Sequence, residues 1–273
     1  MIGIARRLWL GVPAALTLVL GSSVASAQAF GKSADQVERA PERRDVRTEL
    51  PIAAYTYSAH GARKGTAGGQ GFVLGLVAPG QTSTLGGGAT VWGAPLERLT
   101  LVGDAQRNIY GNFSPSIAAI VPLLGERHQG WSLGGLGKFK IDGFASGPRK
   151  NEIESELELG ALISFAEDGF GLDLNLVAGR GLGDDGETDS EMRLRLGHNL
   201  GELVWLGLDA QGRVRVAGPR TLANGRIWDF AAGPQLLLGS GSFFAVLSAG
   251  PATMGLLSKD IGFTSMLGIG GTT

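Results

Sequence analysis

The stretch from Ile153 to Phe165, which reads IESELELGALISF, decides the fold class. Three glutamates, Glu154, Glu156 and Glu158, occupy alternate positions in it. The positions between and beyond them place mainly apolar side chains on the opposite face of an extended chain: Ile153, Ser155, Leu157, Leu159, Ala161, Ile163 and Phe165. A helix would scatter both sets around its circumference. The stretch therefore predicts a β-strand with one charged face and one apolar face.

The same period of two recurs along most of the chain. The apolar positions of 170–178, 191–197 and 204–215 alternate with polar ones such as Asp173, Arg193 and Asp209. No segment after residue 27 is long and apolar enough to predict a membrane helix. Twelve segments of roughly ten residues fit a barrel strand that crosses a bilayer: 70–78, 86–93, 96–105, 113–122, 131–141, 153–165, 170–179, 189–198, 202–216, 226–238, 243–250 and 261–269. We predict an all-β fold, an antiparallel up-and-down transmembrane β-barrel of about twelve strands, with a range of roughly ten to fourteen.

The expected connections support an even number of strands. Short links at 166–169, 199–201 and 239–242 alternate with longer ones at 180–188 and 217–225 and 251–260. Outer-membrane barrels pair short periplasmic turns with long external loops in this way. A further strand over the run from Ala54 to His60 would make the number of wall strands odd, so we place this run outside the wall. Seven aromatic residues beside the expected periplasmic turns predict an interfacial girdle: Trp92, Trp131, Phe165, Phe170, Trp205, Phe243 and Phe244.

The first 27 residues have the order of a secretory signal. The pair Arg6-Arg7 precedes an apolar run from Leu8 to Leu20, and small residues end at Ala27. We predict a signal peptide over 1–27, a charged and largely irregular periplasmic segment over 28–69, and an outer-membrane barrel over 70–273. Residues 28–49 are too rich in charge to bury a core, so a loose segment is expected there and a plug for the barrel is the alternative.

The amino-acid composition limits which classes of partner and fold are expected. The 24 basic and 25 acidic residues nearly balance, which argues against a nucleic-acid partner. The chain has no cysteine, so a secreted fold depends on packing or on its hydrogen-bond ladder. Glycine contributes 46 of 273 residues, against an average of about 7 per cent. In a barrel wall glycine permits close backbone approach and curvature.

Taken together, the signal sequence at 1–27 and the alternating strands over 70–269 resemble Gram-negative outer-membrane β-barrel proteins as a class. The resemblance implies an outer-membrane location and lipid around the barrel. It points to no particular family, and the chain ends on Gly270-Gly271-Thr272-Thr273 where members of the class often end on an aromatic residue.

The sequence predicts no enzyme, cofactor or metal site. Ser190 and His198 share a face of one expected strand, but eight residues at about 3.3 Å each separate them by roughly 26 Å. No cysteine and histidine set with zinc spacing is present. The acidic stretch 183–189 lacks the ligand spacing of a calcium loop, which favours a solvated outer loop, although a bound cation remains the alternative.

The candidate functional residues are the polar side chains expected to face the lumen. They are Glu154, Glu156, Glu158, Asp173, Asn175, Glu191, Arg193, Arg195, Asp209, Arg213 and Arg215. The first hypothesis is a narrow channel or transporter for small polar solutes. The second is a non-conducting structural or surface-interaction barrel with a filled lumen. A lipid-modifying enzyme and a soluble periplasmic barrel are weaker alternatives, and the sequence leaves the oligomeric state open.

Overall fold

The structure is a computed structural model of the whole chain. It describes residues 50, 52–53, 56–77, 83–107, 112–126, 129–143, 152–183, 186–218, 228–240, 242–253 and 261–273. The predicted signal peptide and the segment 28–49 lie outside the described residues. The barrel and the short segment before it belong to one compact unit that ends at Thr272.

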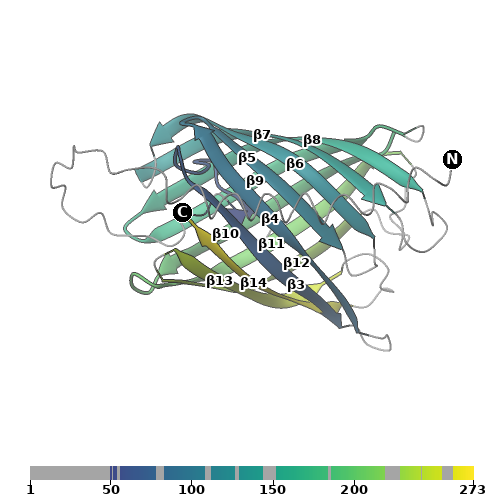
Figure 1. Cartoon of the computed structure of the whole chain (residues 1–273). Helices are drawn as coiled ribbons and strands as arrows, with labels where there is room; N and C mark the ends of the chain where they lie inside the picture. The colour runs from purple at the N-terminus through teal and green to yellow at the C-terminus, as the bar shows by residue number, and fades with distance from the viewer. Residues whose placement is uncertain are drawn as a thin grey trace. The chain divides into compact units, whose positions relative to one another are not determined.

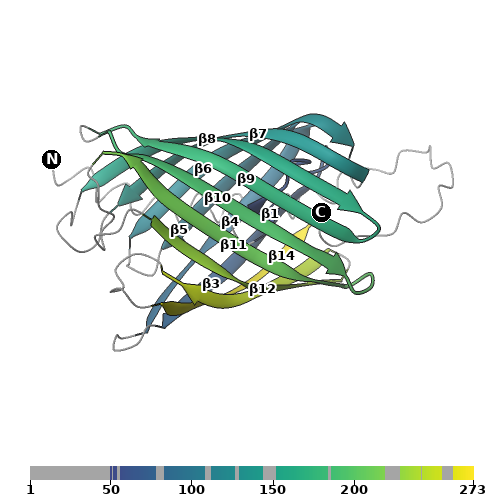
Figure 2. The same cartoon turned by 180° about the vertical axis from the view of Figure 1, so that it is seen from behind.

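Within the described residues, twelve antiparallel strands form a closed barrel, in which β14 pairs with β3 and every other neighbour is consecutive in sequence (Figures 1 and 2). The strands are β3 (Ala67–Val77), β4 (Thr84–Leu96), β5 (Leu99–Arg107), β6 (Phe113–Glu126), β7 (Gln129–Gly143), β8 (Ile153–Glu167), β9 (Phe170–Gly181), β10 (Thr188–Asn199), β11 (Val204–Ala217), β12 (Trp228–Ser240), β13 (Phe243–Ala252) and β14 (Gly262–Thr272). This confirms the predicted fold class and strand number. The first wall strand begins at Ala67, three residues before the predicted Gln70.

The connections alternate in length around the whole barrel. Links of two to four residues at 97–98, 127–128, 168–169, 200–203 and 241–242 lie at the end where the chain enters β3 and leaves β14. The strand ends that longer links join are at the opposite end of the barrel. We call these the turn end and the loop end. The Asp168-Gly169 link has positive φ at both residues, as a two-residue hairpin turn of type I′ requires.

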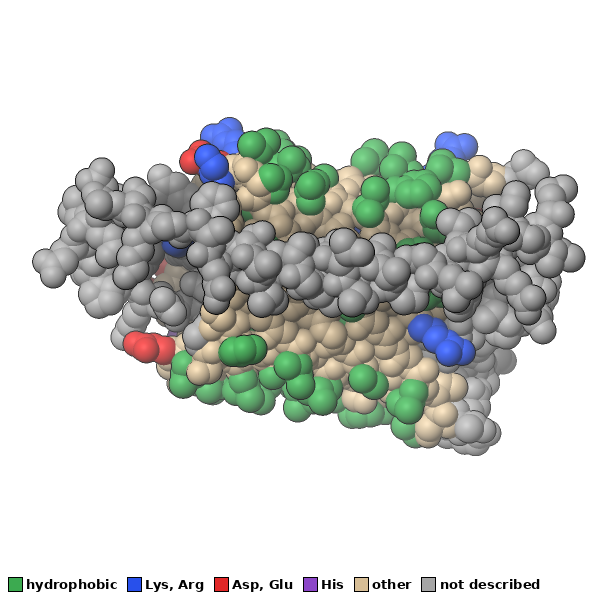
Figure 3. All heavy atoms as spheres, in the orientation of Figure 1, with side chains coloured by type: hydrophobic (Ala, Val, Ile, Leu, Met, Phe, Trp, Pro, Cys, Tyr) green, Lys and Arg blue, Asp and Glu red, His purple; other side chains and the backbone are tan. Residues whose placement is uncertain are grey.

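The outer face of the wall is apolar. In β8, Leu157 and Leu159 are 43% and 60% exposed, whereas Glu158 between them is 2% exposed. Exposed Leu, Ile, Val and Phe side chains continue this pattern on the other strands, and Figure 3 shows them on one side of the barrel. Such a surface matches hydrocarbon rather than water. No helix within the described part of the chain has the length and apolar character needed to cross a membrane.

The aromatic girdle is only partly as predicted. Trp131 and Phe243 are exposed on the outer face, but Trp92, Trp205 and Phe244 are buried inside the barrel. The strand period explains the error, because Trp205 has the same parity as Asp209 and so must share its face. Each buried ring lies over neighbouring glycine: Trp92 over Gly68, Phe244 over Gly270, and Trp205 over Gly197 and Gly207.

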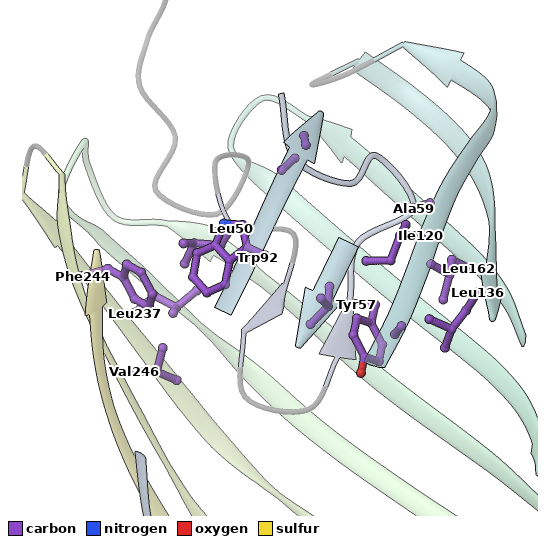
Figure 4. Close-up of a cluster of buried hydrophobic side chains, with 14 of the residues drawn as sticks. Leu50, Tyr57, Ala59, Trp92, Ile120, Leu136, Leu162, Leu237, Phe244 and Val246 are labelled. Carbon is purple, nitrogen blue, oxygen red and sulfur yellow. The ribbon is translucent and has the colours of Figure 1, made fainter. Parts of the chain in front are cut away.

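A short segment lies inside the barrel. The two-residue strands β1 (Ile52–Ala53) and β2 (Thr56–Tyr57) pair with each other and not with the wall. Residues 56–62, which we call the inner segment, are all buried. Leu50, Tyr57 and Ala59 join a hydrophobic cluster with wall side chains that include Trp92 and Ile120 (Figure 4). Of the run Ala54 to His60, residues 54 and 55 lie outside the described residues, and the rest adds no strand to the wall.

Candidate functional site: the inner face of the barrel

All eleven candidate residues lie on the inner face of the wall. Each alternates with an outward side chain, and none is exposed. They come from the four consecutive strands β8 to β11, where the registers bring acidic and basic positions into neighbouring rows. Three groups follow from this arrangement, two toward the loop end and one toward the turn end.

The first group lies toward the loop end. The Arg215 guanidinium contacts Glu187 through Nη1 at 2.5 Å and Asp189 through Nε at 2.6 Å. Arg213 also contacts Asp189, with Nε 2.8 Å from Oδ2. Next along β10, Arg193 Nη2 lies 2.6 Å from Glu191 Oε2. These ion pairs join β11 to β10 and to the link before it, or lie within β10.

The second group joins β7 to β8. Lys140 Nζ lies 2.6 Å from Glu156 and 3.2 Å from Asp142, and Lys138 Nζ lies 3.1 Å from Glu158. Lys138, Lys140 and Asp189 are not among the predicted residues, although all three are essential to the ion pairs of the first two groups. Lys138, Lys140 and Asp142 alternate as the glutamates do, and this period was the signal that could have found them.

The third group lies toward the turn end and meets the inner segment. Arg195 donates to Asp173 Oδ2 from Nε at 3.1 Å and from Nη2 at 2.7 Å. Asn175 bonds the backbone of Tyr57, and Asp209 accepts from Thr56 Oγ1 at 3.3 Å. In this structure, these candidates therefore contact the inner segment or one another.

Side-chain exposure divides the lumen into two halves. At the loop end the side chains of Arg213 and Asp142 are 32% and 22% exposed. At the level of the inner segment the side chains of Arg195 and Asp173 are 1% and 3% exposed. The charged side chains toward the loop end thus range from 3% exposed at Glu158 to 32% at Arg213, and the barrel is closed where the inner segment fills it.

The inner face has an excess of acidic groups. On the described wall strands ten acidic side chains face inward against six basic ones. The acidic set is Asp104, Asp142, Glu154, Glu156, Glu158, Asp173, Asp189, Glu191, Asp209 and Asp229, and the basic set is Lys138, Lys140, Arg193, Arg195, Arg213 and Arg215. On β13, β14 and β3, the inward side chains that the structure describes are uncharged, Phe72, Leu76, Val246 and Met266 among them. The charge therefore lies mainly on one side of the lumen.

The residues considered for other chemistry do not assemble into a site. Ser190 and His198 both lie on the outward positions of β10, near its opposite ends. In the acidic stretch 183–189, Glu187 and Asp189 are ion-paired with Arg215, and Asp184 and Asp185 lie outside the described residues. Among the residues with described positions, no three His, Asp or Glu side chains gather where they could hold a metal ion.

Solved outer-membrane proteins share this barrel at low sequence identity. The NanC porin matches with a TM-score of 0.56 at 8% identity, over 74% of this chain and 98% of that protein. An outer membrane channel from Pseudomonas putida F1 matches with a TM-score of 0.52 at 9% identity, over 79% and 98% of the two chains. The KdgM porin, solved in complex with disordered oligogalacturonate, matches with a TM-score of 0.51 at 6% identity, over 74% and 98%.

The chain shares the closed β-barrel fold of these outer-membrane proteins. This confirms the class-level resemblance seen in the sequence. No protein-family model and no curated protein matches the sequence. At these identities the likeness establishes the fold alone.

Proposed function

We propose that the protein is an outer-membrane channel for small polar solutes. The observation that carries the proposal is the charged inner face, which is accessible to solvent from the loop end at Arg213, Asp142 and Glu191. Charged groups that line a water-filled lumen set the potential along the path of a solute. The apolar outer face supports a location in the membrane, surrounded by lipid.

The ion pairs support an open path rather than a packed core. Lys140, Arg213 and Arg215 pair with groups on their own or adjacent strands, so these contacts keep the charges against the wall. A barrel of about twelve strands is wider than the filled eight-stranded barrel and narrower than the sixteen-stranded porins. The acidic excess favours cations and neutral polar molecules over anions. Two of the similar proteins are named as porins, and one of those is described in complex with oligogalacturonate.

The competing function is a non-conducting scaffold or surface-interaction barrel. One observation favours it, because the inner segment is buried in the lumen and closes the turn end. In the channel proposal this segment closes a path that opens when it moves. In the scaffold hypothesis it is a permanent part of the core.

Planar-bilayer recording separates these functions. We expect the wild type, or the Gly134→Val variant in which the new side chain crowds the inner segment, to show discrete conductance steps. These steps should have a preference for cations. Replacing Glu154, Glu156 and Glu158 together with glutamine leaves seven acidic against six basic inward groups on the described strands, so the reversal potential should move toward anions. Glu167→Gln, on the exposed end of β8, is the control and should leave the reversal potential unchanged. Folded barrels that stay silent in every form would contradict the channel and support the scaffold.

A further inference from the structure

The wall holds the inner segment through its backbone. The Tyr57 N–H donates to Asn175 Oδ1 at 2.7 Å, and Asn175 Nδ2 donates to the Tyr57 carbonyl, also at 2.7 Å. The Asn175 carboxamide therefore offers the donor and acceptor that a neighbouring β-strand would offer. Asn175 is fully buried, so these two bonds replace water that the groups would otherwise bind.

Two hydroxyl groups continue the same recognition along the segment. The Ala59 N–H donates to Ser164 Oγ at 2.8 Å, and the Ala62 N–H donates to Thr100 Oγ1 at 2.7 Å. Ser164 donates its own proton to Asp173 Oδ1 at 2.5 Å, and Arg195 fixes that carboxylate. The Ser164 oxygen is thus oriented to accept from a peptide N–H.

The wall is also shaped for this chain. A Cβ at Gly134 would lie 2.9 Å from the Ala59 carbonyl oxygen, so the missing side chain lets the inner segment approach β7. The next residue, Gly135, has nothing within 4 Å of a built Cβ. On the segment itself, Gly61 has a φ of +60° and turns the chain beside Thr100.

We propose that Asn175, Ser164 and Thr100 form a recognition site for a peptide backbone that is extended at Tyr57 and turns after Ser58, and that residues 56–62 are its exchangeable occupant. The segment then acts as an internal plug, and a short peptide that offers the same N–H and C=O groups competes with it. This inference builds on the proposed channel, because release of the plug opens the turn end. The segment joins β3 covalently but shares no strand pairing with the wall, which allows it to leave without breaking the barrel.

A thiol introduced into the plug reports its position without relying on conduction. The chain has no cysteine, so Ser58→Cys places a single, nearly isosteric thiol on a buried residue. We expect this thiol, in the folded protein in lipid vesicles, to resist a charged maleimide. Adding Asn175→Leu removes two hydrogen bonds and adding Gly134→Val crowds Ala59, so each should raise the labelling rate about tenfold or more. Gly135→Val is the matched control and should leave the rate unchanged.

Competition by peptide tests the recognition itself. A capped peptide of residues 56–62, added in excess to the Ser58→Cys protein, should speed labelling by displacing the plug. The same peptide N-methylated at the Tyr57 and Ala59 nitrogens lacks the donors and should have no effect. Heat-dependent gel mobility verifies that each variant is folded.

Several results would overturn the proposal. The first is an equal labelling rate of the Ser58→Cys thiol in all variants. The second is the same protection of this thiol in Gly134→Val as in Gly135→Val. The third is a peptide that speeds labelling equally well after N-methylation. A thiol that is released as expected in a barrel that passes no ions would contradict the channel while supporting the peptide site.

Discussion

Arg195 shows how strongly a single inward charge depends on its partner. The guanidinium is fully buried and donates two hydrogen bonds to one oxygen of Asp173. Its Nη1 has no hydrogen-bond partner in the structure. Asp209 lies opposite Arg195 on β11, but the two hydrogen bonds of the guanidinium go to Asp173, so Arg195 depends on that carboxylate remaining charged and in place.

Asp173→Asn should therefore destabilise the barrel by about 3–5 kcal/mol, because it removes the charged acceptor of both hydrogen bonds from a buried guanidinium. Urea unfolding in lipid or detergent, followed by tryptophan fluorescence, measures the change. Adding Arg195→Met to Asp173→Asn removes the buried positive charge and should recover much of the lost free energy of unfolding. Glu167→Gln, at an exposed position, should change the free energy of unfolding by less than about 0.5 kcal/mol. Equal effects of Asp173→Asn and Glu167→Gln would refute this account of Arg195.

At the scale of the strand, β8 has an apolar face and a polar face because the two sides of the wall adjoin different environments, the outer surface and the lumen. Its odd positions from Leu157 to Ile163 face outward, and its even positions bear Glu154, Glu156 and Glu158 before changing to Leu162 and Ser164 where the inner segment packs. The change from charge to Leu162 marks the depth at which the lumen is filled.

Replacing an outward residue near the middle of a strand with a charge tests the lipid-facing assignment. Leu159→Arg should reduce the free energy of folding into a bilayer by about 2–4 kcal/mol, because the arginine meets hydrocarbon. Leu200→Arg, in the link between β10 and β11, should cost no more than about 1 kcal/mol because the link lies near the interface. Folding titrations into lipid vesicles give both values. If the two substitutions cost the same, Leu159 does not face lipid.

The strands could be predicted from sequence because lipid outside and polar groups inside impose the same period on every one of them. The face of a side chain also follows from this period, and neglecting it led to the wrong placement of Trp92, Trp205 and Phe244. The position of the inner segment could not be found in this way. Its partners are remote, since Tyr57 and Asn175 are 118 residues apart, and its seven residues show no long alternation.

At the scale of the whole barrel, the described residues form two halves with different roles. The loop half has ion-paired charges that remain partly exposed, and the turn half is closed by the inner segment against Asn175, Ser164 and Thr100. The acidic excess lies beside an uncharged arc on β13, β14 and β3. Solutes would therefore pass along a charged wall to a closed end.

Swelling of proteoliposomes in small polar solutes of graded size tests the channel most directly. With equal amounts of folded protein, Gly134→Val should swell rapidly in the smallest solutes and progressively less in larger ones, because the plug no longer fits against β7. Gly135→Val and the wild type should swell alike and more slowly, because their plug stays in place. A folded Gly134→Val barrel that shows no swelling in any solute would contradict the account.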